Sequence, residues 1–208
     1  MSIRAERKIQ NKQKIIDHVL LLSYEGQPFY NISFRQIAQA VGLVPSAIYR
    51  YFPNKDLLAQ ATIDQVGVFI KSGLFQSRAR FMTHTEENSE ARLAMFFKSV
   101  EEHALYWHFF VSERWGGYPI LENCIEHDVD DLSNDLMLDV KRLEYYKLCE
   151  DPVLKTYTDL LFELSMVWSK QWIKLHKINT QMTEEKRLFL HSCFKKFVFL
   201  KQALITPS

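Results

Sequence analysis

The side chains whose types and spacing could best do chemistry lie in residues 33–58, SFRQIAQAVGLVPSAIYRYFPNKDLL. On a helical wheel Ile48 and Phe52 share one face, and Ser46 and Arg50 stand on the opposite face. Small and basic groups on a free helix face can hydrogen-bond to base edges in the major groove, while flanking hydroxyl and N–H groups contact phosphates. We therefore expect contacts with double-stranded DNA from Ser33, Arg35, Val44, Pro45, Ser46, Tyr49, Arg50, Tyr51 and Lys55.

Two short helices joined by a tight turn must position these side chains. Ser33 opens the first helix with a capping-box pattern, and Gly42 ends it in a left-handed turn. Pro45 begins the second helix, which is expected to run through Tyr51 because Pro53 prevents its continuation. This is the pattern of a helix-turn-helix, whose second helix is the right size to enter the major groove.

The rest of the chain is also predicted to be helical. A long first helix includes Ile9 to Leu20, and Asn54 caps a helix that runs from Lys55 towards Phe75. Helical patterns without strand alternation follow over residues 89–107, 108–115, 120–146, 152–178 and 184–204, with Asp151 as the expected cap of the fourth. We predict an all-α chain: an N-terminal three-helix DNA-binding domain with the helix-turn-helix in residues 1–55, then a helical ligand-sensing and dimerisation domain in residues 56–208.

The composition is that of a globular protein. Of 208 residues 47% are hydrophobic and 25% charged, and glycine and proline number six each, which excludes collagen-like, low-complexity and disordered chains. No apolar run approaches the roughly 18 to 20 residues of a membrane span. The basic N-terminus has no cleavage site of a signal peptide. We expect a cytoplasmic protein with no membrane partner.

Charge is distributed unevenly along the chain. Residues 1–55 hold eight lysines and arginines against three acidic residues, whereas the remainder holds eighteen against twenty-two. A basic end on an acidic body favours a polyanion-binding module carried by a second domain. Ordinary variation between charged helix faces would give the same counts.

Residues 37–58, IAQAVGLVPSAIYRYFPNKDLL, resemble the TetR family of one-component transcriptional regulators. They share the small-residue second helix, the Gly-containing turn, the Tyr-x-Tyr-Phe close and the Lys-Asp-Leu-Leu helix start. Pro45 stands where a hydrogen-bonding or basic residue is common in the family. The resemblance implies a regulator that binds a palindromic operator as a homodimer, most often as a repressor, and that responds to a small molecule.

A thinner resemblance connects the chain with the FabR and DesT type of fatty-acid regulators. It rests on short matches spread along the chain: Ile3-Arg4-Ala5, Tyr49-Arg50-Tyr51-Phe52, Asp64 with Gly67, Ala79-Arg80 and Ser112-Glu113-Arg114. This similarity implies control of lipid genes and an acyl-CoA or fatty acid as the effector. A regulator of efflux or other metabolism that responds to a planar or cationic ligand is the alternative.

Aromatic residues of the C-terminal domain are numerous enough to line an apolar pocket. Arg114 follows several of them and could meet a thioester carbonyl or a phosphate. Ordinary core packing for the aromatic residues, and a surface pair of Arg114 with Glu113 or Glu122, are the simpler interpretations. The expected pocket residues are Phe97, Trp107, Phe110, Arg114, Trp115 and Trp168.

The last two helices carry apolar residues on more than one face. Such helices must be buried on two sides, one against their own subunit and one against a twin. A four-helix dimer interface would also place two recognition helices about 34 to 36 Å apart for a palindrome. The residues expected in this interface are Leu164, Trp168, Phe194 and Phe197.

An enzyme is the opposing class, most plausibly a helical-bundle metalloprotein. That chemistry uses Glu-x-x-His pairs on facing helices, but none of the seven histidines has a glutamate three residues before it. Cys124 with His127, and His191 with Cys193, are isolated pairs. The three cysteines are best interpreted as reduced thiols. We expect no catalytic residue, metal or cofactor.

Overall fold

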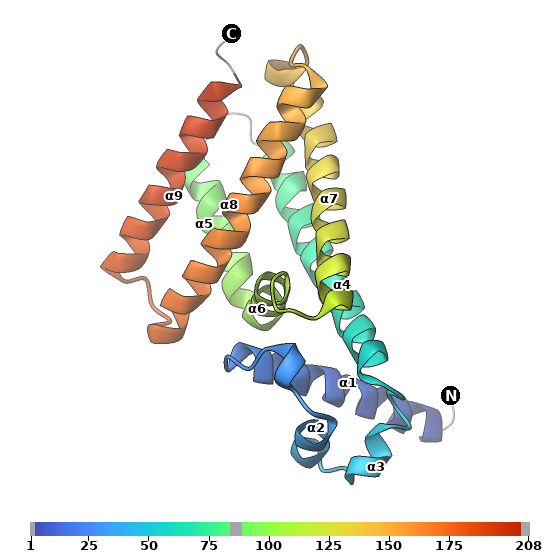
Figure 1. Cartoon of the computed structure of the whole chain (residues 1–208). Coiled ribbons are helices and arrows are strands. Elements are labelled where there is room, and N and C mark those ends of the chain that lie inside the picture. The colour runs from blue at the N-terminus through green and yellow to red at the C-terminus, as the bar shows by residue number, and fades with distance from the viewer. Residues whose placement is uncertain (1–2, 84–88, 205–208) are drawn as a thin grey trace.

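The computed structural model describes residues 3–83 and 89–204, and every regular element among them is a helix (Figure 1). This confirms the all-α prediction. The α-helices are α1 (Ile3–Tyr24), α2 (Phe34–Ala40), α3 (Pro45–Ile48), α4 (Lys55–Thr83), α5 (Ser89–Glu102), α6 (Ala104–Glu113), α7 (Pro119–Lys141), α8 (Asp151–Ile178) and α9 (Glu184–Ala203). Two single 3-10 turns are η1 (Phe29–Asn31) and η2 (Glu144–Tyr146).

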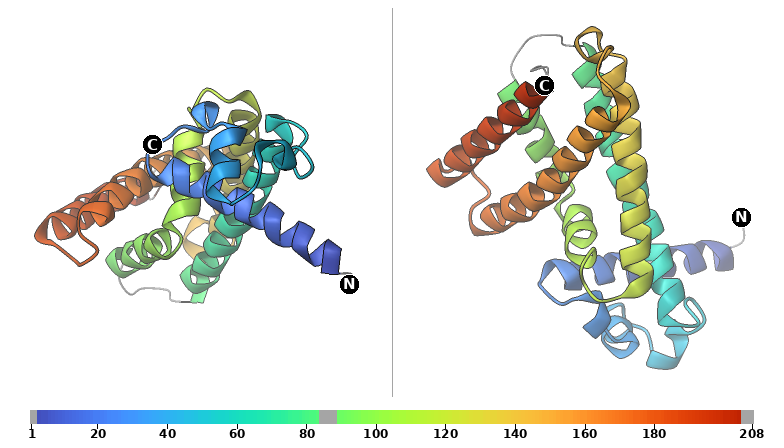
Figure 2. Two further views of the ribbon diagram at one scale, coloured as in Figure 1. Left: turned by 90° about the horizontal axis from the view of Figure 1, so that it is seen from below. Right: turned by 45° about the horizontal axis from the view of Figure 1, so that its top comes forward.

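The helices form a small N-terminal unit and a larger body (Figures 1 and 2). Helices α1, α2 and α3 make the small unit, and α4 starts beside them before continuing into the body. In the body α7 packs against α4 and α8, and α9 packs against α5 and α8. Helix α6 lies between the body and α1, so it is the element of the body in closest contact with the small unit.

The small unit is closed by apolar side chains from each of its helices. Ile15 and Val19 of α1, Ile37 of α2, Ile48 of α3 and Phe52 are all buried. Burying each such side chain contributes about 1.5 to 3 kcal/mol, and this packing holds α2 and α3, which are too short to be stable alone, against α1. The predicted inward face of Ile48 and Phe52 is therefore confirmed.

Several predicted boundaries differ from the structure. Helix α3 ends at Ile48 and residues 49–51 form turns, so the second helix is shorter than predicted. The break predicted between residues 107 and 108 lies instead at His103, and the pattern over 120–146 divides into α7 and η2. No proline or glycine marks these breaks, which is why the apolar periodicity runs through them.

The expected cap at Asp151 is also wrong. Glu150 is the cap residue without a capping hydrogen bond, and Asp151 is the first residue of α8. The Asp151 carboxylate instead forms an ion pair with Lys141 Nζ at 2.8 Å, which connects the end of α7 to the start of α8. Within residues 3–83 and 89–204 no helix is both long and apolar enough to cross a membrane.

Candidate nucleic-acid interface

Local hydrogen bonds fix the turn between α2 and α3. Ser33 Oγ accepts from Gln36 N at 3.2 Å, and Gln36 Oε1 accepts from Ser33 N at 2.9 Å, which completes the predicted capping box. Gly42 has φ +70°, the left-handed conformation that favours glycine, and Leu43 N donates to Ala38 O at 2.8 Å. Both features were predicted from the sequence, and together they set the angle between α2 and α3.

Helix α3 presents one free face to solvent. Ala47 and Ile48 are buried, whereas Pro45, Ser46 and Arg50 are exposed. Val44 is 62% exposed and Tyr49 is 56% exposed. These five residues of predicted DNA contact, Val44, Pro45, Ser46, Tyr49 and Arg50, therefore lie together on the outer side of the small unit.

The other predicted contacts border this face. Ser33 and Arg35 are exposed at the start of α2, and the Phe34 ring meets the Tyr49 ring edge-on at 5.1 Å. Tyr51 is half-buried, and its hydroxyl accepts a hydrogen bond from Asn11 Nδ2 at 2.8 Å. That bond joins the turn after α3 to α1, whose N-terminal end projects past α4 (Figures 1 and 2).

Lys55 has different surroundings from the rest of the predicted set. Its Nζ donates to Tyr30 O at 2.6 Å and lies 5.0 Å from the Phe29 ring centroid and 5.5 Å from that of Tyr118. Burial lowers the pKa of the Lys55 ammonium, and the nearby Glu113 carboxylate opposes that shift. Lys55 thus lies in the junction between the small unit and the body.

The geometry described above matches a known class of proteins. A sequence profile described as bacterial regulatory proteins, tetR family, matches residues 24–62, which include α2, α3 and the start of α4. Residues 24–62 thus carry the DNA-binding region of the TetR family. A curated relative from Haemophilus influenzae (strain ATCC 51907 / DSM 11121 / KW20 / Rd), named an uncharacterized HTH-type transcriptional regulator, is 27% identical over 78 residues. That match covers 38% of this chain and 38% of the relative.

Solved structures of TetR-family proteins share the fold over most of the chain. A tetR-family transcriptional regulator from Streptomyces coelicolor superposes with a TM-score of 0.62 at 17% identity, over 98% of this chain and 83% of that one. A TerR/AcrR-family regulator from Aquifex aeolicus VF5 gives 0.59 at 16% identity, over 91% and 99%. At such identities the likeness shows the fold. The resemblance to the FabR and DesT type stays a prediction.

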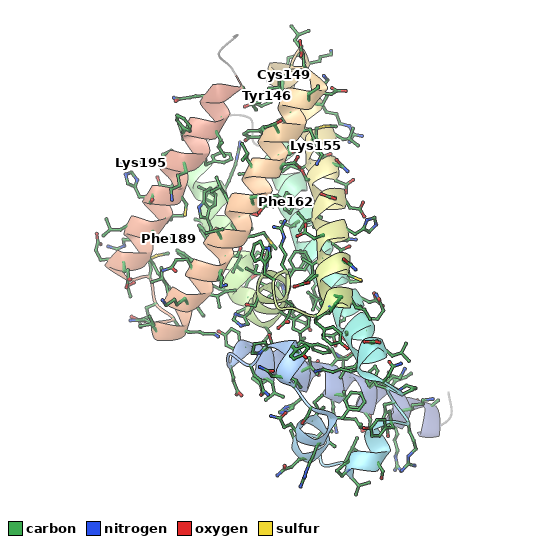
Figure 3. The ribbon with its side chains drawn as sticks, viewed as in Figure 1. Tyr146, Cys149, Lys155, Phe162, Phe189 and Lys195 are labelled. Carbon is green, nitrogen blue, oxygen red and sulfur yellow. The ribbon has the colours of Figure 1, made fainter. Side chains whose placement is uncertain are left out.

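The aromatic residues predicted for a pocket belong mostly to the core of the body. Phe97, Trp107, Phe110 and Trp168 are buried. Phe97 stacks on Trp172 with ring centroids 4.4 Å apart, and its neighbours include Phe189 of α9. Figure 3 shows both Phe189 and Lys195 on α9; Phe189 is partly buried and Lys195 is exposed. Trp115 is set apart, because its side chain is 59% exposed.

Arg114 is held by two carboxylates. Its guanidinium makes four hydrogen bonds of 2.6 to 3.1 Å, two with Glu126 of α7 and two with Glu163 of α8. The Trp115 ring covers it at 4.9 Å. The simpler interpretation, a surface pair with Glu113 or Glu122, is wrong. The actual partners, Glu126 and Glu163, are 12 and 49 residues away in the sequence.

The residues predicted for a dimer interface fall into two groups. Trp168 and Phe197 are buried within their own subunit, whereas Leu164 and Phe194 are partly exposed. Leu164 lies between the exposed Leu160 and Val167 of α8. Phe194 lies between the partly buried Leu190 and Val198 of α9. These spacings place one apolar stripe on each of the last two helices.

Sequence reasoning missed the polar side chains that join the small unit to the body. Glu113 of α6 is only 1% exposed, and His108 donates from Nε2 to Ser23 O at 2.9 Å. Burial lowers the pKa of His108 to about 4, and Lys177 and Lys170 add to the effect. A glutamate in the apolar run of α6 was the available signal. In the part of the chain that the structure describes, no group of three or more His, Cys, Asp or Glu side chains could hold a metal ion.

Proposed function

We propose that this protein is a TetR-type transcriptional repressor that binds a palindromic DNA operator as a homodimer and changes its affinity for that operator when a small molecule binds the body. One observation carries the proposal: the capping box of α2 and the left-handed turn at Gly42 precede a short helix and turn in which Ser46, Tyr49 and Arg50 are exposed while Ala47 and Ile48 are buried. A side-chain set of this kind suits a short helix that enters the major groove.

Each exposed side chain has a distinct role in this proposal. Arg50 can form a bidentate hydrogen bond with a guanine edge, and Ser46 can bond to either partner of a base pair. Tyr49 and Tyr51 lie at the sides, where their hydroxyls can reach phosphates. The exposed Lys8, Lys12 and Lys14 of α1 add positive charge next to this surface and would raise affinity for any sequence.

A second copy of the chain is the proposed partner of α8 and α9. Leu160 and Val167 are 47% and 56% exposed, and Leu164 lies between them on the same face. Covering such a stripe removes apolar area from water, at about 25 cal/mol per Å². Two copies related by a twofold axis would form a four-helix interface and present two α3 helices to one duplex.

The effector is proposed to be apolar, with a long-chain acyl-CoA or fatty acid as the first candidate. This candidate rests on the aromatic content of α5, α6 and α8 and on the resemblance to the FabR and DesT type. Since both Arg114 partners are carboxylates of this chain, a thioester or phosphate would have to displace them, so we assign the head group no partner here. A planar or cationic effector is the alternative.

Selection from a random pool of duplex DNA tests the proposed function. Purified protein should enrich an inverted repeat whose half-sites are about one helical turn apart. The matched variant Arg50→Ala, which keeps the fold because Arg50 is exposed, should enrich the repeat less. A pool that shows no enriched motif after several rounds with the wild type would contradict operator binding.

Titrating the selected duplex in the presence of C4, C12, C16 and C18:1 acyl-CoA tests the effector. Long chains should change the operator affinity at least about fivefold and C4 should not, because each buried methylene contributes about 0.8 kcal/mol. The coupling must be reciprocal, so operator DNA should change acyl-CoA affinity by the same factor. Overlapping curves for all four would remove the acyl-CoA candidate and leave the planar or cationic one.

A further inference from the structure

The end of α6 and its connection to α7, residues 113–118, reach both ends of the helix-turn-helix. Glu113 Oε1 accepts a hydrogen bond from Phe29 N at 3.0 Å and one from Ser23 Oγ at 3.4 Å. Phe29 begins η1, the turn that leads into Ser33 and α2. At the other end, Tyr118 Oη donates to Asp56 Oδ1 in the first turn of α4 at 2.6 Å. One short segment of the body therefore holds the chain before α2 and after α3.

Glu113 occupies this position against a considerable electrostatic cost. The side chain is 1% exposed, and its Oε2 has no hydrogen-bond partner among the described residues. Burial raises the pKa of the carboxyl group, while the Phe29 N–H, Ser23 and the charge of Lys55 oppose that shift. A buried charge with one unsatisfied oxygen is weak evidence for a role in stability, so a role in fixing geometry is the better explanation.

Gly116 leaves the space that the carboxylate needs. A Cβ atom at this position would lie 2.4 Å from Glu113 Oε2 and 3.2 Å from Glu113 Cα. Both distances are shorter than normal contacts, so a residue with a Cβ atom at position 116 would require the Glu113 carboxylate to shift, and we expect that shift to weaken its hydrogen bond with Phe29 N. The position of the Glu113 carboxylate therefore depends on the glycine at position 116.

Further contacts from α6, α8 and the α6–α7 connection hold the end of α1 and η1. His108 of α6 bonds to Ser23 O at 2.9 Å, and Lys177 at the end of α8 donates to Tyr24 O. The Phe29 ring packs edge-on against Tyr118 at 4.8 Å. A displacement of α6 would therefore move the end of α1 and η1 together.

We propose that Glu113 is a positioning residue that sets the orientation of the helix-turn-helix relative to the body. Its carboxylate does not touch DNA. It acts by holding Phe29 N, and Gly116 keeps it in place. This inference rests on the proposed function only in the test that measures DNA binding.

Two substitutions of Glu113 separate positioning from mere stability. In Glu113→Gln the amide oxygen can still accept from Phe29 N, but the amide nitrogen has no acceptor. This variant should unfold at a lower temperature and keep its affinity for the selected duplex. Glu113→Ala removes the acceptor, and we expect at least about fivefold weaker DNA binding, the lower end of typical coupling between sites. Glu25→Gln, an exposed carboxylate of the small unit, is the control and should change neither property.

Hydrogen–deuterium exchange provides a readout that needs no DNA. Glu113→Ala should speed the exchange of amides in residues 29–36 at least about fivefold relative to the wild type and leave α9 unchanged. Gly116→Ala should reproduce both effects, and it keeps the test decisive if Glu113→Ala does not fold. Added to Glu113→Ala, it should have a smaller effect than in the wild type, because the carboxylate at 2.4 Å is gone and only the 3.2 Å contact with the Cα atom of residue 113 remains.

Three results would overturn this inference. They are wild-type exchange over residues 29–36 in Gly116→Ala and in any folded Glu113→Ala, wild-type operator affinity in both, or an exchange increase spread evenly over the whole chain. A wild type that binds no duplex would instead contradict the proposed function. The exchange experiment would still decide the role of Glu113.

Discussion

Arg50 and Lys55 are five residues apart, yet the structure gives them different surroundings. Arg50 is exposed in the turn that follows α3, whereas Lys55 Nζ donates to Tyr30 O and lies against three aromatic rings. The family resemblance treats both as DNA contacts. Only the folded chain distinguishes them, because the partners of Lys55 lie 25 or more residues away. Removing the side chain of Arg50 and removing that of Lys55 should therefore have different effects on the protein.

Arg50→Ala should weaken binding to the selected duplex by about 1 to 3 kcal/mol and relax the preference at one position of each half-site, because a bidentate base contact is lost. Fluorescence anisotropy titrations with single-base variants of the duplex measure both effects. Arg187→Ala, an exposed arginine of α9, is the matched control. Equal affinities of Arg50→Ala and the wild type for every duplex would exclude base recognition by Arg50.

His108 predicts a dependence of stability on pH. Its pKa is lowered from 6.5 to about 4 in the folded protein, so between these values the unfolded chain binds more protons. The contribution of His108 is therefore complete above about pH 6.5 and is lost as the pH falls towards 4. Glu113, whose pKa is raised, contributes in the opposite direction, so the comparison must be made with a variant of His108 alone.

His108→Gln keeps a donor for Ser23 O and removes the titration. Urea unfolding at several pH values between 4 and 6.5 should show a smaller loss of stability on acidification in this variant than in the wild type. His127→Gln, at an exposed histidine of α7, should follow the wild-type curve. Parallel curves for all three proteins would mean that His108 is not held neutral.

Among the secondary-structure elements, the helix-turn-helix was the most predictable because its signals are local. The Ser33 capping box, the left-handed Gly42 and the Asn54 cap of α4, whose Oδ1 accepts from Leu57 N at 2.8 Å, all involve residues within three positions of each other or a single φ angle. The division between α5 and α6 at His103 and the carboxylates that bind Arg114 depend on tertiary packing. No local pattern contains that information.

Ser33→Ala tests the capping box as the device that sets α2. The variant loses the acceptor for Gln36 N, which should reduce the free energy of unfolding by about 1 kcal/mol. Ser46→Ala, at an exposed position of α3, should change it by less than about 0.5 kcal/mol. Urea denaturation compares the two. The cap assignment fails if both variants are equally stable.

The whole molecule is proposed to work as a twofold dimer formed by α8 and α9. Val167 is 56% exposed in one subunit, so Val167→Glu should separate the dimer and leave the subunit folded. Phe197 is buried within its subunit, and Phe197→Glu should unfold it. Light scattering with circular dichroism distinguishes these outcomes. Leu138→Glu, at an exposed position of α7, is the control. A wild type that is monomeric at micromolar concentration would contradict the dimer.

Recognition of DNA by α3 and the turn that follows it can be tested by measuring the affinity of the wild type for the selected duplex and for a shuffled duplex of equal length at several salt concentrations. We predict a preference of at least about 10³ for the selected sequence at physiological salt, and an affinity for both duplexes that falls linearly with salt on a double logarithmic plot. Equal affinities for the two duplexes would contradict sequence recognition by α3.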